Sequence, residues 1–201
     1  MTPLPLEFFA RDALDVAHDL IGCVLVRGEV RVRLTEVEAY RVGDTANHAR
    51  MGRTARNAPM WGPAGHLYVY LCYGMHALAN LVCGSEGDAA AVLLRAAEPL
   101  DGHDVLRARR GRGGTLAPLV PSLMDGPGKL AQALGLTVAH SGLALGHPDA
   151  VQVLPRAAPV RLAVGPRIGI DYAGPEDVLA PWRIADADSR WVGKRAALRP
   201  L

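Results

Sequence analysis

Residues 30–40 read VRVRLTEVEAY, a run whose first five residues alternate between apolar and charged side chains. This is the period of a β-strand, so the run predicts one long strand. One face of the strand begins apolar and ends in two carboxylates and a phenol: Val30, Val32, Leu34, Glu36, Glu38 and Tyr40. A carboxylate that continues an apolar face is costly unless it is paired or lies at a cleft, and burial makes it a better general base. The alternative is a frayed strand end with its glutamates in water.

The pattern around this strand predicts a sheet made of hairpins. Apolar spacing predicts a helix at 10–21 that ends at Gly22, short helices at 101–110 and 127–134, and strands at 23–26, 67–72, 78–83, 89–96 and 160–170. Hairpins outnumber helix-linked crossovers, so we expect a largely antiparallel sheet with helices packed around it, a mixed α/β (α+β) fold. We expect one domain over residues 1–201, with the Gly-, Pro- and Ser-rich stretch 110–127 as a long loop within it.

Composition narrows the class of protein. Half of the 201 residues are apolar and 21% are charged, which excludes a disordered or fibrous chain. The three cysteines form no C-x-x-C pair, so we expect neither a disulfide framework nor a Cys-based zinc site, and a reducing, cytoplasmic location. Residues 57–85 carry no charged side chain, yet prolines, glycines and polar residues interrupt them, so we expect no membrane span.

Charge and aromatic residues are unevenly distributed. The net charge of +2 does not by itself indicate a nucleic-acid-binding protein. Residues 41–84, however, hold four arginines against the single acid Asp44, and four of the five tyrosines lie between positions 40 and 73. Taken singly, such clusters are typical of a solvated face or of core packing. Together with a carboxylate they suit an extruded nucleic-acid base, because rings stack on the base, arginines hold phosphates and the carboxylate activates water.

These features lie in blocks that resemble the alkyladenine (3-methyladenine) DNA glycosylase family. The blocks run in the family's order over nearly the whole chain: TEVEAY (35–40), NHARMGRTARN (47–57), LYVYLCYGMH (67–76) with Asn80, VLLRAAEP (92–99), GPGKL (126–130) and PRIGI (166–170). The resemblance implies a single mixed α/β domain whose curved, largely antiparallel sheet carries a protruding β-hairpin that inserts into DNA.

The resemblance also implies roles for residues of the pocket. Glu38 matches the general base that activates the water attacking C1′ of a flipped nucleotide. Arg95 and the backbone carbonyl of Ile168 match the groups that hold this water. The residues implied to contact the damaged base are Tyr40 on one face, His48 and Tyr70 on the other, and Asn80, which excludes normal guanine by a clash with its exocyclic amine.

Further residues are implied to contact the DNA outside the pocket. Tyr73 matches the side chain that fills the gap left by the base, and Met75 lies beside it in the minor groove. We assign the phosphate contacts to Arg50, Arg53, Arg56 and Lys129. The loop 50–56 lacks the Gly pair and the proline expected there, so the sequence leaves open which arginine meets which phosphate. The stretch 107–122 has no counterpart in the family pattern.

The resemblance therefore predicts a monomeric base-excision repair enzyme that acts on damaged purines in double-stranded DNA and leaves an abasic site. Alkylated, cationic purines leave without an acid, whereas neutral deaminated or etheno lesions need a protonated group, for which His48 is the nearest candidate. A lyase step needs an amine. Neither lysine, Lys129 nor Lys194, falls in a block expected to form the pocket, so we expect base release alone, with no metal and no cofactor.

Two other interpretations fit the same residues. A non-catalytic nucleic-acid-binding domain would use the tyrosines as a stacking platform and would give Glu38 no special role. A metallohydrolase would use Glu38 with His48, His66 and His76, although no H-E-x-x-H spacing supports it.

Overall fold

The predicted long strand, β2 (Val30–Tyr40), lies at the centre of the sheet in the computed structural model, which describes residues 2–111 and 113–201. Strand β5 (Ala91–Asp101) pairs with one edge of β2. Along the other edge, β1 (Val24–Arg27) pairs with the first half of β2 and β8 (Arg183–Asp186) with its second half. The strand pairs among the described residues are antiparallel, which confirms the predicted fold class.

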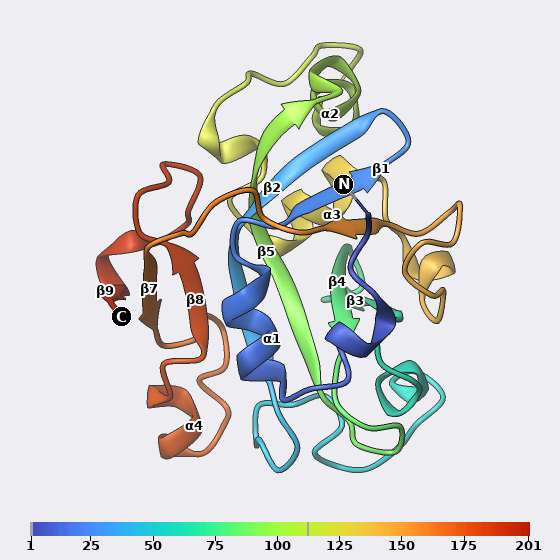
Figure 1. Ribbon diagram of the computed structural model, residues 1–201, viewed down its shortest axis with the longest axis vertical. Coiled ribbons are helices and arrows are strands. Elements are labelled where there is room, and N and C mark those ends of the chain that lie inside the picture. Colours follow the sequence, from blue (N-terminus) through green and yellow to red (C-terminus); the bar gives the residue numbers. More distant parts are fainter. Residues whose placement is uncertain (1, 112) are drawn as a thin grey trace.

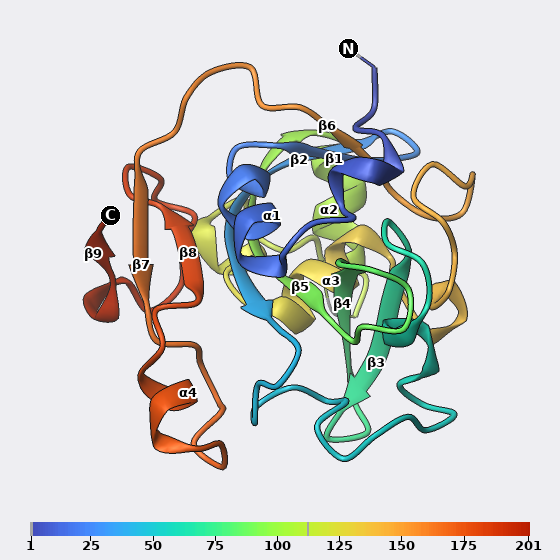
Figure 2. The same cartoon turned by 60° about the horizontal axis from the view of Figure 1, so that its bottom comes forward.

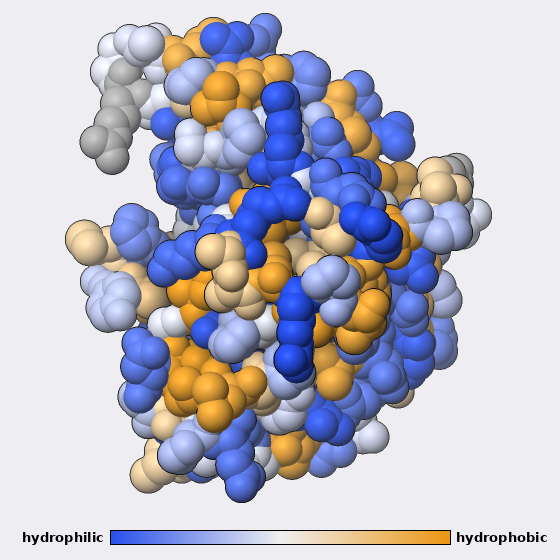
Figure 3. All heavy atoms as spheres, turned by 90° about the vertical axis from the view of Figure 1, so that its left-hand side faces the viewer, coloured by the Kyte–Doolittle hydropathy of each residue, from blue (hydrophilic) through white to orange (hydrophobic). Residues whose placement is uncertain are grey.

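The sheet runs in the order β3-β4-β5-β2-β8-β7-β9 (Figure 1), β1 pairs with the first half of β2, and β6 pairs with the other edge of β1. The remaining strands within the described residues are β3 (Leu67–Cys72), β4 (His76–Val82), β6 (Gln152–Leu154), β7 (Leu162–Gly165) and β9 (Arg199–Pro200). Seen from the edge formed by β7 to β9, the surface mixes apolar patches with hydrophilic side chains (Figure 3).

Four α-helices in the described part of the chain pack around this sheet: α1 (Ala13–Leu20), α2 (His103–Arg110), α3 (Pro127–Leu134) and α4 (Pro175–Leu179). The side chain of Asp12 caps α1 by accepting a hydrogen bond from the N–H of Leu14 over 2.8 Å. Helix α1 packs against β2 and β5, whereas α3 packs against β4, β5 and α2. Short 3₁₀ helices lie at Leu6–Phe8, Ala58–Trp61, Pro121–Leu123, Val138–His140 and Arg195–Ala197.

Most of the predicted elements are confirmed, but the C-terminal third was predicted poorly. The bounds of β2, β3 and α3 match the prediction. The strand predicted at 160–170 is wrong beyond Gly165, because Pro166 has no N–H to give to a sheet and Gly169 has a φ of +77°. The sequence pattern missed β6, β8, β9 and α4. Met1 and Arg112, which fall in the predicted domain and its long loop, lie outside the described residues.

One apolar cluster extends from Phe9 to Trp191 and joins α1, α3 and the central strands into a common core. A second, smaller cluster includes Met60 and Tyr68, with Tyr70 packed against it. The charge-free stretch 57–85 supplies β3 and β4 to the sheet. No helix in the described ranges combines the length and the apolar character that crossing a membrane requires.

Strands β3 and β4 form a hairpin whose turn is exposed. Cys72 pairs with His76, which leaves a three-residue turn in which Tyr73 has a φ of +50° and Gly74 one of +70°. The side chains of Tyr73 and Met75 are 89% and 73% exposed. Figure 2 shows the loop that precedes β3 next to the turn end of this hairpin, where Arg56 donates to the carbonyl of Leu71 over 2.5 Å.

Candidate active site

Glu38 is completely buried and receives three hydrogen-bonding groups. The hydroxyl of Tyr40 donates to Oε2 over 3.0 Å, and the backbone N–H of Ile168 donates to Oε1 over 2.8 Å. Nη1 of Arg95 lies 3.1 Å from Oε1. A buried carboxylate is tolerated when donors satisfy it in this way. The alternative of a frayed strand end in water is therefore wrong for Glu38.

Strand register brings Glu38 into line with residues from three other strands. Leu93 lies opposite Glu38, Asn80 opposite Leu93 and Tyr68 opposite Asn80, so the four form a row across β2, β5, β4 and β3. Residues directly opposite each other in antiparallel strands share a face of the sheet. Asn80 is buried, and its amide nitrogen donates to the carbonyl of Tyr68 over 3.0 Å.

A cavity of about 840 Å³ opens above this row. Glu38 is not among the residues that line it, but the three groups that contact Glu38 are. Glu38 thus lies one layer behind the wall, screened by Tyr40, Arg95 and Ile168. The wall contains most of the predicted site residues: Tyr40, His48, Arg56, Tyr70, Tyr73, Asn80, Arg95, Lys129 and Ile168.

Aromatic rings form the side of the cavity away from β2. The ring centroids of His48 and Tyr70 are 4.1 Å apart, and those of Tyr68 and Tyr70 are 5.4 Å apart with nearly parallel planes at 27°. Nδ1 of His48 lies 3.2 Å from the hydroxyl of Tyr68. Both tyrosines on β3 therefore line the cavity, and Tyr68 is in addition buried in the smaller apolar cluster.

His48 is held in its neutral form. Burial, and then the positive charges of Arg56 and Arg50, lower the pKa of His48 to about 4. The free protein therefore presents a neutral imidazole at pH 7. The prediction that His48 supplies a proton to neutral lesions is not supported by this environment.

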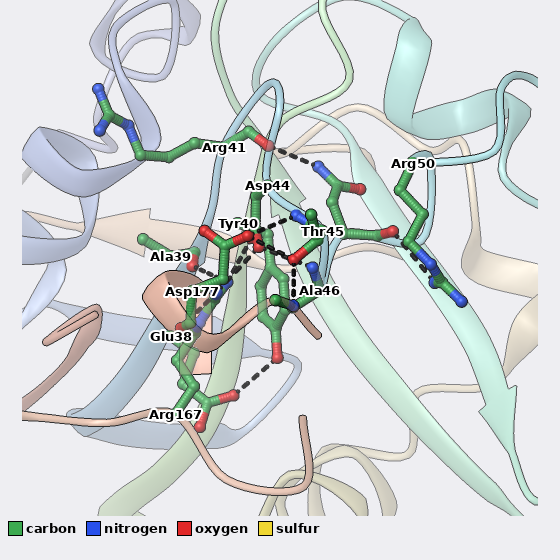
Figure 4. Close-up of polar contacts among 12 residues, drawn as sticks. Glu38, Ala39, Tyr40, Arg41, Asp44, Thr45, Ala46, Arg50, Arg167 and Asp177 are labelled. Carbon is green, nitrogen blue, oxygen red and sulfur yellow. Dashed lines mark hydrogen bonds and ion pairs between the residues drawn. The ribbon is translucent and has the colours of Figure 1, made fainter. Parts of the chain in front are cut away.

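The guanidinium of Arg167 stacks on the ring of Tyr40, a contact that the sequence did not predict (Figure 4). Its guanidinium carbon lies 4.7 Å from the centroid of the Tyr40 ring and 4.9 Å from that of Trp182. The guanidinium pairs with both oxygens of buried Asp44, and Nη1 donates to the carbonyl of Ala39 over 3.0 Å. Two features of the sequence could have drawn attention to the Asp44–Arg167 pair: Asp44 is the one acid in 41–84, and Arg167 belongs to the PRIGI block.

A second buried glutamate, Glu36, lies two positions before Glu38. Its Oε1 accepts from Nε of Arg95 over 2.8 Å and lies 3.3 Å from Nη1 of Arg183. The predicted common face of Glu36, Glu38 and Tyr40 is confirmed, since Arg95 contacts both carboxylates and Tyr40 contacts Glu38. A register irregularity between Leu34 and Val37 interrupts the β2–β5 ladder at this point.

Of the basic side chains assigned to phosphates, Arg56 and Lys129 line the cavity and Arg50 contacts Tyr172 in its wall. Arg50 lies over the ring of Tyr172, 5.0 Å from its centroid, and Arg56 over that of Tyr70 at 5.7 Å. Nζ of Lys129 on α3 lies 2.6 Å from Oδ1 of Asp125. Arg53 is exposed and makes no hydrogen bond or ion pair with the described residues. Sequence reasoning did not single out Tyr172, which also lines the cavity.

The residues of the metallohydrolase interpretation do not assemble. Among residues 2–111 and 113–201, no three side chains of the types His, Cys, Asp and Glu converge as metal ligands would. His66 instead has Nδ1 3.2 Å from the carbonyl of Ala64, and His76 is exposed next to the hairpin turn. The three cysteines, Cys23, Cys72 and Cys83, are free.

This combination of an antiparallel α+β fold, a buried carboxylate and an aromatic cavity has counterparts among known proteins. Residues 7–190 match the methylpurine-DNA glycosylase (MPG) family. Because this match covers most of the chain, the protein belongs to that family.

Curated relatives support the same assignment over the full length. A DNA-3-methyladenine glycosylase of Arabidopsis thaliana is 47% identical over 203 residues, which covers all of this chain and 78% of the relative. A protein of Nitrosococcus oceani, provisionally named a 3-methyladenine DNA glycosylase, is 52% identical over 98% of this chain and 96% of its own. A protein of Methanocella arvoryzae with the same provisional name is 44% identical over 98% of each chain.

Proposed function

We propose that the protein is a monofunctional DNA glycosylase that removes alkylated purines from double-stranded DNA with a water activated by Glu38. The observation that carries this proposal is the position of Glu38, buried directly behind the wall of an aromatic cavity. Its three partners, the hydroxyl of Tyr40, the guanidinium of Arg95 and the N–H of Ile168, hold the carboxylate in place. Arg95 and the carbonyl of Ile168 are the groups expected to hold the water.

The reaction breaks the bond between C1′ of the sugar and the purine nitrogen. Water attacks C1′, its proton passes to Glu38, and the electron pair of the glycosidic bond leaves with the base. A general base of this kind contributes about 10²- to 10⁴-fold to the rate. Tyr40 remains a hydrogen-bond donor throughout, because burial, and then the charge of Glu38, raise the pKa of its hydroxyl far above 10.

The neutral state of His48 favours cationic substrates. Alkylation at N3 or N7 places a positive charge on the purine, so the base departs as a neutral molecule without an acid. Neutral lesions such as hypoxanthine or etheno-adenine gain no proton from an imidazole whose pKa is about 4. We therefore place 3- and 7-alkylated purines ahead of deaminated or etheno bases as substrates.

The hairpin supports base flipping in this proposal. Extrusion of a base costs a few kcal/mol, and a side chain that enters the vacated stack offsets part of that cost. Tyr73 lines the cavity and is 89% exposed at the β3–β4 turn, which supports this role. Met75 is exposed on the same turn and would contact the minor groove.

The expectation that no lysine lies at the pocket is wrong, because Lys129 lines the cavity. We nevertheless propose base release without strand cleavage, since Nζ of Lys129 is engaged with Asp125 at 2.6 Å. Borohydride treatment during the reaction traps a Schiff base if one forms. We expect no trapped protein–DNA adduct; an adduct that disappears in Lys129→Ala would show a lyase step.

The central test is release of methylated purines from duplex DNA treated with dimethyl sulfate, measured under single-turnover conditions. We expect the wild-type protein to release 3-methyladenine and 7-methylguanine, and Glu38→Gln to bind the DNA with at least about a 100-fold slower release. Glu98→Gln is the matched control, because Glu98 pairs with Arg33 on the same two strands and is partly exposed. Release by Glu38→Gln at the wild-type rate would instead favour a domain in which Glu38 has no catalytic role.

A further inference from the structure

Glu36 has no part in the mechanism above, although it is as deeply buried as Glu38. Its carboxylate accepts from Nε of Arg95 over 2.8 Å through Oε1 and from the backbone N–H of Gly193 over 2.8 Å through Oε2. Nη1 of Arg183 lies 3.3 Å from Oε1. A buried carboxylate with several donors is costly to assemble, and breaking such a group by removing one charge is strongly destabilising to its partners.

The two glutamates and two arginines form one buried chain of alternating charge, Arg183–Glu36–Arg95–Glu38. The exposed fractions of the four side chains, in that order, are 0%, 1%, 8% and 0%. Arg95 divides its planar guanidinium between the two acids, with Nε toward Glu36 and Nη1 toward Glu38 at 3.1 Å. When Nε is fixed, the direction of Nη1 is fixed as well, because the guanidinium is rigid.

The far side of Glu36 is supported by the C-terminal segment 191–194. Arg183 donates to the carbonyls of Gly193 and Lys194 over 3.3 and 3.4 Å, and the hydroxyl of Thr35 donates to the carbonyl of Trp191. A Cβ atom added at Gly193 would lie 2.8 Å from the backbone oxygen of Asp125. This segment begins after residue 190, where the match to the family ends.

We propose that Glu36 is a positioning residue for base release: held by Arg183 and Gly193, it aims Arg95 at Glu38. The inference rests on the proposed function. Glutamine at position 36 keeps the shape of the side chain but places an NH₂ group or a neutral oxygen where Arg95 and Arg183 require a charged acceptor. The guanidinium of Arg95 then loses its fixed orientation and turns its charge toward Glu38 alone.

The test compares Glu36→Gln with the wild type in single-turnover release of 7-methylguanine from a methylated duplex. We expect the rate to fall by about 10-fold or more, because a charge-assisted hydrogen bond is lost. The affinity for a duplex carrying a tetrahydrofuran abasic-site analogue should stay within about twofold, since Glu36 does not line the cavity. Glu98→Gln, the partner of Arg33 on the same strands, should change neither quantity.

The pH dependence of the rate separates positioning from a merely structural role. Glu38 is faced by Arg95 from β5, by Tyr40 from β2 and by the N–H of Ile168, and it also interacts electrostatically with Arg167 and with Tyr70 from β3. Glu36 is faced by Arg95, Arg183 and the N–H of Gly193. When Glu36 loses its charge, the buried chain keeps two positive charges, Arg183 and Arg95, and one negative charge, Glu38. This excess of positive charge favours the ionised form of Glu38. The low-pH limb of the rate profile should therefore move to lower pH in Glu36→Gln.

Gly193→Ala keeps the test decisive if Glu36→Gln does not fold. It retains every charge but displaces the N–H that holds Glu36, so the rate should fall by about 3- to 10-fold while the low-pH limb stays in place. A folded Glu36→Gln with the wild-type rate and profile would overturn the proposal, as would an unfolded Glu36→Gln accompanied by a Gly193→Ala of wild-type rate. If the wild type releases no methylated base, the proposed function itself fails.

Discussion

The hydroxyl of Tyr40 donates a hydrogen bond to Oε2 of Glu38 over 3.0 Å. The ring expected to stack on the damaged base is thus tied to the carboxylate expected to activate water. Both residues belong to the second half of β2, two positions apart, so the strand geometry alone places them on one face. Arg167, stacked on the ring of Tyr40, completes the support of this pair.

Tyr40→Phe separates the two functions of this residue. It keeps the ring but removes one of the three groups that contact Glu38, so the rate of base release should fall by about 3- to 10-fold. Affinity for lesion DNA should hardly change. Tyr40→Ala, which also removes the ring, should weaken both, and single-turnover rates with equilibrium binding measure the difference. Equal losses of affinity in the two variants would contradict the assignment.

His48 makes the stability of the protein depend on pH. Its folded-state pKa of about 4 lies below the unfolded value of 6.5, first because of burial and then because of Arg56 and Arg50. The unfolded chain binds this proton more tightly, so the contribution of the neutral imidazole is complete above pH 6.5 and is lost as the pH falls toward 4. The free energy of unfolding should decrease by at most about 3 kcal/mol over this window.

Urea unfolding at pH 7 and at pH 4.5 measures this effect. His48→Gln does not titrate, so it should show a smaller loss of stability between the two pH values than the wild type. The control is His76→Gln, because His76 is exposed. If His48→Gln loses as much stability as the wild type, His48 is not the group responsible.

The local pattern predicted the parts of the site that lie on the central strands. The alternation in residues 30–40 indicated Glu38 and Tyr40 on one face, and the run at 67–72 indicated Tyr70 on a hairpin. These predictions succeeded because strand period and hairpin turns depend on neighbouring residues. The cross-strand row from Glu38 to Tyr68 follows once these strands pair.

The long-range contacts that hold these site residues in place could not be predicted from the local sequence pattern. The contact between Arg167 and Asp44 joins residues 123 positions apart, and that between Glu36 and Arg183 joins residues 147 apart. No spacing rule connects such residues. The segment 166–170 was predicted as strand, but β7 ends before Pro166 and the segment is a loop. This loop provides two contacts of the site: the N–H of Ile168 donates to Glu38, and Arg167 stacks on Tyr40.

The hairpin turn offers a test of base flipping. Tyr73 is almost fully exposed, so Tyr73→Ala should change the free energy of unfolding by no more than about 0.5 kcal/mol. Base release from a paired lesion should slow, whereas release from a lesion in single-stranded DNA should not, because no stack has to be refilled. Leu179→Ala, at another exposed apolar side chain, is the control. Equal slowing on both DNA forms would contradict insertion of Tyr73.

The salt dependence of DNA binding tests the basic loop. Arg53 is exposed and makes no hydrogen bond or ion pair with the described residues, whereas Arg56 donates to Leu71 and lies over Tyr70. Arg53→Gln should therefore reduce the slope of log K against log salt by about 1, as expected for one lost phosphate contact. Arg56→Gln should reduce the slope similarly and should also slow base release, because it disturbs the cavity wall.

Arg161 provides the matched control for these variants. It is an exposed arginine paired with Asp188 beside β7, at the opposite end of the sheet from the hairpin. Arg161→Gln should leave the salt slope unchanged, and fluorescence anisotropy with a labelled lesion duplex at several salt concentrations measures all three variants. If Arg161→Gln lowers the slope as much as Arg53→Gln does, DNA binds across the β7 edge, and the loop 50–56 is not its principal phosphate contact.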